Sequence, residues 1–333
     1  MLYYDNIKPP TPTTLYILSI YRATPDVPLD TQSIDDITHR GRVLTLETGK
    51  DAEPITLLDN LHMPDGITIS QKLGRIFWTQ MGNPLANDGA VMSANLDGSG
   101  AISLLPPGAV HTPKQIIIDE EAGKLYFCDR EGLRVHRCDL DGGGQEILVQ
   151  TGDWVLNKDH QNEQTRWCVG IAISKKLGKI FWTQKGAPKS KQGRIFSANI
   201  DIPAGFTGQN RPDIELVAGD LPEPIDLEFD EDAGALYWTD RGEFPFGNTL
   251  NKKTLLGDVP ASEQKLGRQI LAEGFAEAIG LALDKENECA WVADLAGRVW
   301  KCDVRKPAAK QKIFESETSV FTGLAVMHTE ASL

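Results

Sequence analysis

The sequence lacks most of the features that would identify an enzyme or a metal protein at first sight. It has five cysteines in 333 residues, without the close spacing that zinc sites use. It contains no HExxH, GxSxG, phosphate-binding loop or dinucleotide-binding glycine motif. We therefore predict no metal site and no cofactor. Cysteines this scattered are typical of reduced thiols in the cytoplasm.

Long apolar runs and an excess of basic residues are also missing. No apolar run approaches the roughly 18 residues of a membrane helix, and residues 1–14 lack the basic and apolar regions of a signal peptide. The 34 basic and 47 acidic residues give a formal net charge of -13. A nucleic-acid partner would require a basic face. We therefore expect a cytoplasmic protein with no membrane span and no nucleic-acid partner.

What the sequence does contain is a repeat. The segment 170–199, GIAISKKLGKIFWTQKGAPKSKQGRIFSAN, matches 66–95, GITISQKLGRIFWTQMGNPLANDGAVMSAN, and a third copy begins DLEFDEDAGALYWTDRG at Asp226. Each copy holds short runs with the alternation of β-strands. Strand patterns that recur about every 50 residues are typical of propeller blades.

The copies align column by column, and this alignment gives the number of blades. The bulky residue of the second strand and the residue twelve positions before it define five complete copies. These pairs are Gly66 and Trp78, Gln115 and Phe127, Gly170 and Trp182, Asp226 and Trp238, and Gly280 and Val292.

A sixth blade has to be assembled from the two ends of the chain. The run 322–327 supplies its first strand, and runs from Leu15, Arg42 and Ile55 supply the other three. We predict an all-β fold, a six-bladed β-propeller of four-stranded antiparallel blades. Residues 1–14 form a tail and 15–333 a single domain, and pairing of the two ends removes open sheet edges.

The lengths of the joints indicate which face carries a ligand site. Joints between the first and second strands are short, whereas those between the second and third strands, or between blades, reach the lengths of 81–89, 151–167, 185–193 and 241–248. Binding sites are usually built from loops on a rigid scaffold. We call the face with the long loops the upper face and predict a funnel there. The long lower loop 201–213 has no functional explanation in the sequence.

Polar residues interrupt the apolar pattern of the first strands, which form the channel wall. Gln115 and Asp226 replace glycine, and the column one position earlier contains Asp65, Lys114 and Thr322. These side chains either bind a ligand at the funnel mouth or are solvated by channel water. Asp65 also lies in the turn-forming sequence PDG.

Further candidates lie in the upper loops. Arg241 begins the loop RGEFPFGN, and its guanidinium offers several donors in a fixed fork. The aromatic side chains of these loops cover either a core edge or a ligand. His62 precedes a first strand and is a candidate acid or base. The candidate substrate-binding residues in the loops are Glu243, Phe244, Phe246, Trp154 and Trp167.

The run LYWTDRG (236–242), echoed by IFWTQ and LYFCDREG, resembles the YWTD six-bladed propellers of the low-density-lipoprotein-receptor class. The resemblance covers the five complete copies and is specific for the fold. The fuller run YWTDRGEFPFGNTLN (237–251) looks more like soluble fungal YWTD-type proteins of secondary metabolism. The characterised group that this suggests is the hetero-Diels–Alderases of tropolone sesquiterpenoid pathways.

This resemblance implies an enzyme that acts on two small molecules. A hydroxymethyl tropolone or phenol would lose water to give an ortho-quinone methide, which then adds across an alkene of a humulene-type terpene. Such a reaction needs mainly proximity and orientation, which supply up to roughly 7–11 kcal/mol, and no cofactor. Arg241 or Lys114 would polarise the methide oxygen, and His62 or Asp226 would assist water loss.

Two other classes of function remain open from the sequence. One is a metal-dependent lactonase or hydrolase with a divalent ion on the axis, to which Asp65 and Asp226 could contribute oxygen ligands. The other is a non-catalytic protein-binding propeller. A deep apolar funnel would favour a small molecule, and a broad polar rim would favour a protein partner.

The metal-dependent alternative leads to a direct prediction. Because the mouth columns contain few acids and include Lys114, we expect chelation by EDTA to leave both activity and melting temperature unchanged. Thermal melts and turnover measured with and without EDTA check this. Loss of activity that Ca²⁺ or Zn²⁺ restores would favour the hydrolase instead.

Overall fold

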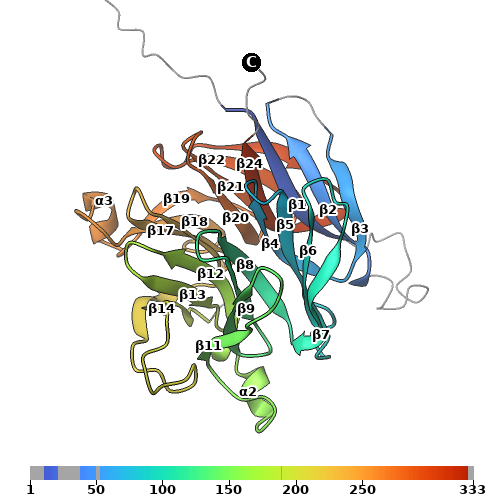
Figure 1. The fold of residues 1–333 in the computed structure, drawn as a ribbon. Coiled ribbons are helices and arrows are strands. Elements are labelled where there is room, and N and C mark those ends of the chain that lie inside the picture. Colours follow the sequence, from blue (N-terminus) through green and yellow to red (C-terminus); the bar gives the residue numbers. More distant parts are fainter. Residues whose placement is uncertain (1–10, 22–37, 50–52, 189, 329–333) are drawn as a thin grey trace, which may run out of the picture.

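The structure, a computed structural model, describes residues 11–21, 38–49, 53–188 and 190–328. Six four-stranded antiparallel sheets lie around a central axis, as the repeat predicts (Figure 1). We number the blades along the chain, and the inner strand of each blade contacts those of its two neighbours. The predicted tail falls largely on residues outside these ranges.

The strands of the first three blades follow the repeat. Blade 1 holds β4 (Pro64–Ser70), β5 (Arg75–Gln80), β6 (Gly89–Asn95) and β7 (Ile102–Val110). Blade 2 holds β8 (Pro113–Asp119), β9 (Lys124–Asp129), β10 (Arg134–Asp139) and β11 (Glu146–Gln150). Blade 3 holds β12 (Cys168–Ser174), β13 (Lys179–Gln184), β14 (Gly193–Asn199) and β15 (Glu215–Leu221).

The remaining blades complete the ring. Blade 4 holds β16 (Pro224–Asp230), β17 (Ala235–Asp240), β18 (Thr249–Thr254) and β19 (Gln269–Glu273). Blade 5 holds β20 (Ala278–Asp284), β21 (Cys289–Asp294), β22 (Arg298–Asp303) and β23 (Lys310–Glu315). Blade 6 holds β24 (Ser319–His328), β1 (Thr13–Tyr21), β2 (Gly41–Glu47) and β3 (Ile55–Leu61). The short helices α2 (Asp159–Asn162), η1 (Gln164–Arg166) and α3 (Ala261–Gln264) lie in connections.

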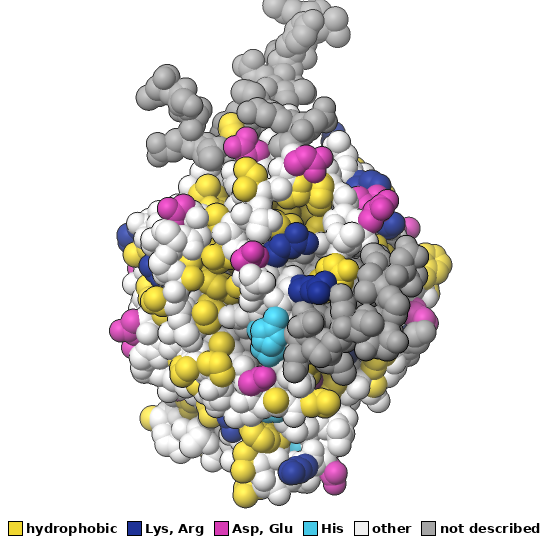
Figure 2. Space-filling view, turned by 90° about the vertical axis from the view of Figure 1, so that its right-hand side faces the viewer, with side chains coloured by type: hydrophobic (Ala, Val, Ile, Leu, Met, Phe, Trp, Pro, Cys, Tyr) yellow, Lys and Arg dark blue, Asp and Glu magenta, His cyan; other side chains and the backbone are white. Residues whose placement is uncertain are grey.

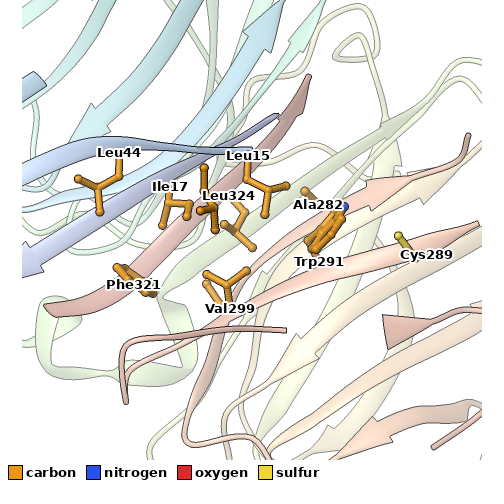
Figure 3. Close-up of a cluster of buried hydrophobic side chains, with 11 residues drawn as sticks. Leu15, Ile17, Leu44, Ala282, Cys289, Trp291, Val299, Phe321 and Leu324 are labelled. Carbon is orange, nitrogen blue, oxygen red and sulfur yellow. The ribbon is translucent and has the colours of Figure 1, made fainter. Parts of the chain in front are cut away.

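Blade 6 joins the two ends of the chain, as predicted. Its strand order is β24-β1-β2-β3, so the last strand pairs with the first (Figure 1). Side chains of this blade pack against blade 5, and Leu15, Ile17 and Leu324 face Trp291 in one buried cluster (Figure 3). The closure therefore buries apolar surface as well as a sheet edge.

Threonine hydroxyls connect neighbouring blades directly. Thr79 Oγ accepts the amide N–H of Gly66 in its own blade at 2.9 Å and donates to the Lys114 carbonyl of the next blade at 2.7 Å. Thr183 in blade 3 and Thr239 in blade 4 make the corresponding pairs of bonds. Each of these hydroxyls is fully buried and uses both its donor and its acceptor capacity.

The glycine column is explained by close approach of the inner strands. A Cβ atom on Gly66 would lie 2.6 Å from the Lys114 carbonyl oxygen, and one on Gly170 would lie 2.0 Å from that of Ile225. Larger side chains at these positions would push the blades apart. Among the described residues, no helix is long and apolar enough to cross a membrane.

Ring closure gives the second prediction. Deleting residues 322–333 removes most of β24, the partner of β1, and exposes apolar side chains such as Leu15 and Ile17. We expect the truncated chain to lose cooperative folding, which circular dichroism melts measure. Deleting residues 329–333 alone leaves β24 whole and is the control. A truncated chain that melts near the wild-type midpoint would show that closure does not hold the ring together.

Candidate functional site

A cavity of about 210 Å³ opens on the upper face over the channel axis, where the loop lengths predict a funnel. Its wall consists mainly of two rings of side chains, one residue from each blade in each ring. The inner ring stands directly before the glycine column: Asp65, Lys114, Val169, Ile225, Ile279 and Thr322. The outer ring stands three positions after the bulky column: Ile20, Met81, Arg130, Lys185, Arg241 and Leu295.

The outer ring divides the cavity mouth into two halves. Arg130, Lys185 and Arg241 come from the adjacent blades 2, 3 and 4, whereas Leu295, Ile20 and Met81 come from blades 5, 6 and 1. One half of the rim therefore carries cations and the other is apolar. A space-filling view of one face of the molecule shows cationic, acidic and apolar side chains interleaved around a histidine (Figure 2).

A buried carboxylate holds two of these cations in place. Glu223 is 3% exposed, and its Oε1 lies 2.7 Å from Lys185 Nζ and 3.3 Å from Arg241 Nε. Arg241 Nη2 lies 3.0 Å from Glu277 Oε2. The Arg241 Nε–H is buried and lacks hydrogen-bond geometry to any described acceptor. Such a donor at the cavity wall suits an oxygen atom of a ligand.

The third cation is held by a carboxylate and an aromatic ring. Arg130 Nη2 lies 2.6 Å from Glu131 Oε1, and the Arg130 guanidinium stands 4.9 Å from the centre of the Trp167 ring. Lys185 Nζ stands 5.3 Å from the same ring. Trp167 therefore positions two cations, a different contact from the substrate binding that the sequence suggested.

The floor of the cavity is closed by a buried ion pair. Lys114 Nζ donates to Asp65 Oδ1 at 2.5 Å and lies 3.0 Å from the Met81 sulfur, while Gln115 Nε2 lies 3.3 Å from Asp65 Oδ2. Thr322 Oγ donates to the Pro64 carbonyl. Burial lowers the pKa of Lys114, and the Asp65 carboxylate opposes this shift. Asp65, Lys114 and Thr322 thus lie at the predicted mouth.

Asp226 lies outside this upper cavity, contrary to the prediction. Its carboxylate accepts the backbone amides of Leu227 and Leu281, so it links blades 4 and 5. Together with Gln115 and Glu228, it lines a second axial cavity of about 220 Å³ whose other walls are mainly Ile and Leu. Burial raises the pKa of Asp226 well above its ordinary value.

Several loop residues also differ from expectation. Phe244 is 77% exposed and Phe246 37% exposed, and neither lines the upper cavity. Neither Glu243 nor His62 is part of the upper cavity wall, and the His62 ring stacks on that of His39 with centroids 4.0 Å apart. Trp154 meets the His111 ring edge-on at 5.0 Å, away from the cavity wall.

Sequence reasoning missed several residues of the outer ring, although the repeat contains the signal for them. Lys185 stands in the same column as Arg130 and Arg241, and the column also contains Met81 and Leu295. Extending that column to every blade would have predicted the divided rim. Glu223 had no comparable signal, because it lies in a joint between blades.

The described residues include no group of three or more His, Cys, Asp or Glu side chains placed to hold a metal ion. Among the described residues that line the cavity, Asp65 supplies the one carboxylate, and none is Ser, Cys or His. The arrangement suits binding and polarisation of oxygen atoms by cations.

Comparison with known proteins places the chain among fungal sequences. It is 40% identical over 308 residues to the low-density lipoprotein receptor-related protein 1 of Pyricularia oryzae, which covers 90% of this chain and 96% of that protein. The chain belongs to the same family as that fungal protein. No protein-family profile matches the chain.

A second fungal relative extends beyond the propeller. The chain is 48% identical over 275 residues to the 3-hydroxyacyl-CoA dehydrogenase-like protein LAM1 of Cochliobolus heterostrophus, covering 81% of this chain but only 58% of that protein. Among solved structures, the propeller in a nidogen/laminin complex matches 95% of this chain and 98% of its own, with a TM-score of 0.64 and 16% identity. That likeness supports the fold alone.

The lower cavity gives a pH-dependent prediction. Burial raises the pKa of Glu228 to about 7, so the folded state holds this proton more tightly than the unfolded chain does. Stability is therefore lost as the pH rises through about 7. Glu228→Gln removes the titration, and we expect it to raise the free energy of unfolding at pH 8 by roughly 2 kcal/mol while changing little at pH 5.

Urea unfolding of both proteins at the two pH values measures the difference. If the free energy of unfolding differs between Glu228→Gln and wild type by the same amount at pH 5 and at pH 8, the pKa of Glu228 is not raised in the folded protein. Glu120→Gln, on the exposed turn after β8, is the control and should show no such difference.

Proposed function

We propose that this family member is a cofactor-independent enzyme of secondary metabolism that binds a small oxygen-bearing ring in the upper cavity. The observation that carries the proposal is the divided rim, with Arg130, Lys185 and Arg241 on one side and Leu295, Ile20 and Met81 on the other. The cationic side suits adjacent ring oxygens, and the apolar side suits a hydrocarbon partner.

The reaction proposed is a hetero-Diels–Alder cycloaddition between an ortho-quinone methide and a humulene-type terpene. The exocyclic carbon and the carbonyl oxygen of the methide bond to the two carbons of one terpene alkene, and no atom is lost. Negative charge that develops on the oxygen would be stabilised by Arg241, whose Nε–H lies near Glu223 but makes no hydrogen bond to a described residue. No nucleophile is required, which fits the absence of Ser, Cys and His from the described wall.

The size of the cavity bears on how two partners would be arranged. At about 210 Å³ it is smaller than the roughly 300–1,000 Å³ of typical ligand pockets. We therefore propose that the oxygenated ring enters the cavity and the terpene lies across the apolar half of the rim. Proximity then supplies most of the acceleration.

Formation of the methide requires loss of water from a hydroxymethyl precursor. Lys114 and Asp65 form the acid–base pair in the cavity floor. The Lys114 ammonium would protonate the leaving hydroxyl and Asp65 would accept the proton of the ring hydroxyl. Proton return from Asp65 to Lys114 then restores both groups. His62 and Asp226 lie away from this wall and have no part in the step.

The Cochliobolus relative is named as dehydrogenase-like, but this chain spans only 58% of that protein and contains no dinucleotide-binding glycine motif. A dehydrogenase activity is therefore not part of the proposal. The five cysteines are buried and form no disulfide bonds. This supports a reducing environment, and we propose a cytoplasmic location.

The test measures product formation from a hydroxymethyl tropolone and a humulene-type terpene, compared with the spontaneous reaction. Arg241→Ala should lower turnover by about 10²–10³-fold, the usual effect of removing one preorganised donor. Lys185 remains to pair the buried Glu223, and the other partner of Arg241, Glu277, is exposed to solvent, so the variant should melt near wild type. Lys114→Ala should also be slow.

Arg134→Ala is the control, because Arg134 lies on the outer strand β10 away from the cavity. Variants of Arg241 and Lys114 that melt normally and keep full turnover would place the chemistry elsewhere. A wild-type protein that only matches the spontaneous rate and stereochemistry would reject the cycloaddition for these substrates.

A further inference from the structure

A second cleft, of about 360 Å³, lies on the outside of the ring between blades 2 and 3. Its walls come from the two middle strands of blade 3, from the outer strand β11 of blade 2, and from the insertion that carries α2 and η1. The lining residues used below are Trp182, Gln184, Arg194, Phe196, Val149 and Ile214. None of them takes part in the proposed cycloaddition.

Strand register explains why four of these residues share one wall. Trp182 on β13 is paired with Phe196 on β14, and Gln184 is paired with Arg194. Since side chains alternate along a strand, all four point to the same face of the blade 3 sheet. The Trp182 and Phe196 rings stack with centroids 5.7 Å apart, and the Arg194 guanidinium lies 5.1 Å from the Phe196 ring centre.

Two buried donors on this wall have no protein acceptor. Trp182 is 1% exposed and its Nε1–H has no hydrogen-bond partner among the described residues, and the same is true of the Arg194 Nε–H. Arg194 uses Nη2 to donate to the Thr165 carbonyl. A buried donor without an acceptor costs free energy unless a water or a ligand satisfies it.

The charge of Arg194 is also uncompensated. The described residues place no carboxylate within ion-pair distance of it, whereas Arg166 on the same cleft pairs with Glu163 and donates to the Thr151 carbonyl. Desolvation lowers the pKa of Arg194 from its ordinary value. The cleft therefore contains one half-buried guanidinium that has no carboxylate partner among the described residues.

Other blades do not combine these features. The residues paired with Trp78 and Gln80 in blade 1 are Met92 and Ala90, and those paired with Trp238 and Asp240 in blade 4 are Asn251 and Thr249. Blade 2 has Arg134 in the arginine column but Phe127 in place of the tryptophan. Unpaired indole nitrogens recur at Trp78 and Trp238, but blade 3 adds an arginine and a cleft.

We propose that this cleft is a second ligand site that binds a small organic carboxylate. One carboxylate oxygen accepts from Arg194 Nε–H and the other from Trp182 Nε1–H, and the apolar part of the ligand lies against Val149, Phe196 and Ile214. Two available donors match the two oxygens of a carboxylate better than the several oxygens of a phosphate. The site is independent of the function proposed for the upper cavity.

The probe for the test is benzoate, with benzamide as its neutral counterpart. Binding is followed through the indole N–H signals of ¹⁵N-labelled protein, where Trp182→Phe identifies the Trp182 signal by its absence. We expect benzoate in the millimolar range to move that signal downfield. Arg194→Met should weaken the benzoate response at least about tenfold, or 1.4 kcal/mol.

Matched variants separate this site from the rest of the protein. Arg134→Met removes the arginine of the same column in blade 2 and should respond like wild type. Arg241→Met removes a cation of the upper cavity and should also leave the Trp182 response unchanged. Each variant is first shown to melt near wild type, and Arg194→Lys replaces Arg194→Met if the latter does not fold.

Three results would overturn the proposal. The Trp182 signal does not move at any benzoate concentration in the millimolar range, or it moves equally in Arg194→Met, or benzamide moves it as strongly as benzoate. The last result would show that the cleft recognises a neutral carbonyl and not a carboxylate.

Discussion

The double hydrogen bond of a buried threonine hydroxyl is the interaction on which the rest of the molecule depends. Thr79, Thr183 and Thr239 each fix the inner strand of one blade against the backbone of the next. The glycine column permits this approach, because a Cβ atom there would collide with the neighbouring backbone. The two rings of the upper cavity lie within a few residues of these bonds in sequence. Their spacing around the axis is therefore set by the blade contacts and not by the loops.

The fold could be predicted from the sequence because it rests on recurrence. The Trp and Gly columns give the hairpin length, and the C-terminal run has no partner except the N-terminal strands. The cavity mouth could be predicted in part, since Asp65, Lys114, Thr322 and Arg241 do line it. For the other candidate residues, the sequence does not show toward which end of the channel each side chain points. Along an inner strand, a shift of one residue moves a side chain from the upper to the lower cavity: Lys114 lines the first and Gln115 the second.

Charge pairing was equally hidden from sequence reasoning. The carboxylate that holds Lys185 and Arg241 belongs to Glu223, which precedes the inner strand of blade 4 and has no repeat signature. The exposure of Phe244 was hidden as well, because the aromatic composition of a loop does not determine how far a side chain is buried. The long lower loop 201–213 now has a structural explanation. Gly208 accepts from the Gln150 amide and Arg211 donates to the Leu148 carbonyl, so the loop covers the outer edge of β11.

The pairing of β1 with β24 has a consequence for how the protein is made. β1 is synthesised about 300 residues before β24, its inner partner. At about 5–20 residues per second, this strand waits roughly 15–60 s for its partner. During that time a strand that is almost wholly buried in the folded ring has one open edge. The nascent chain is therefore a natural client for chaperones that shield strand edges, and slow translation of the last blade would lengthen its exposure.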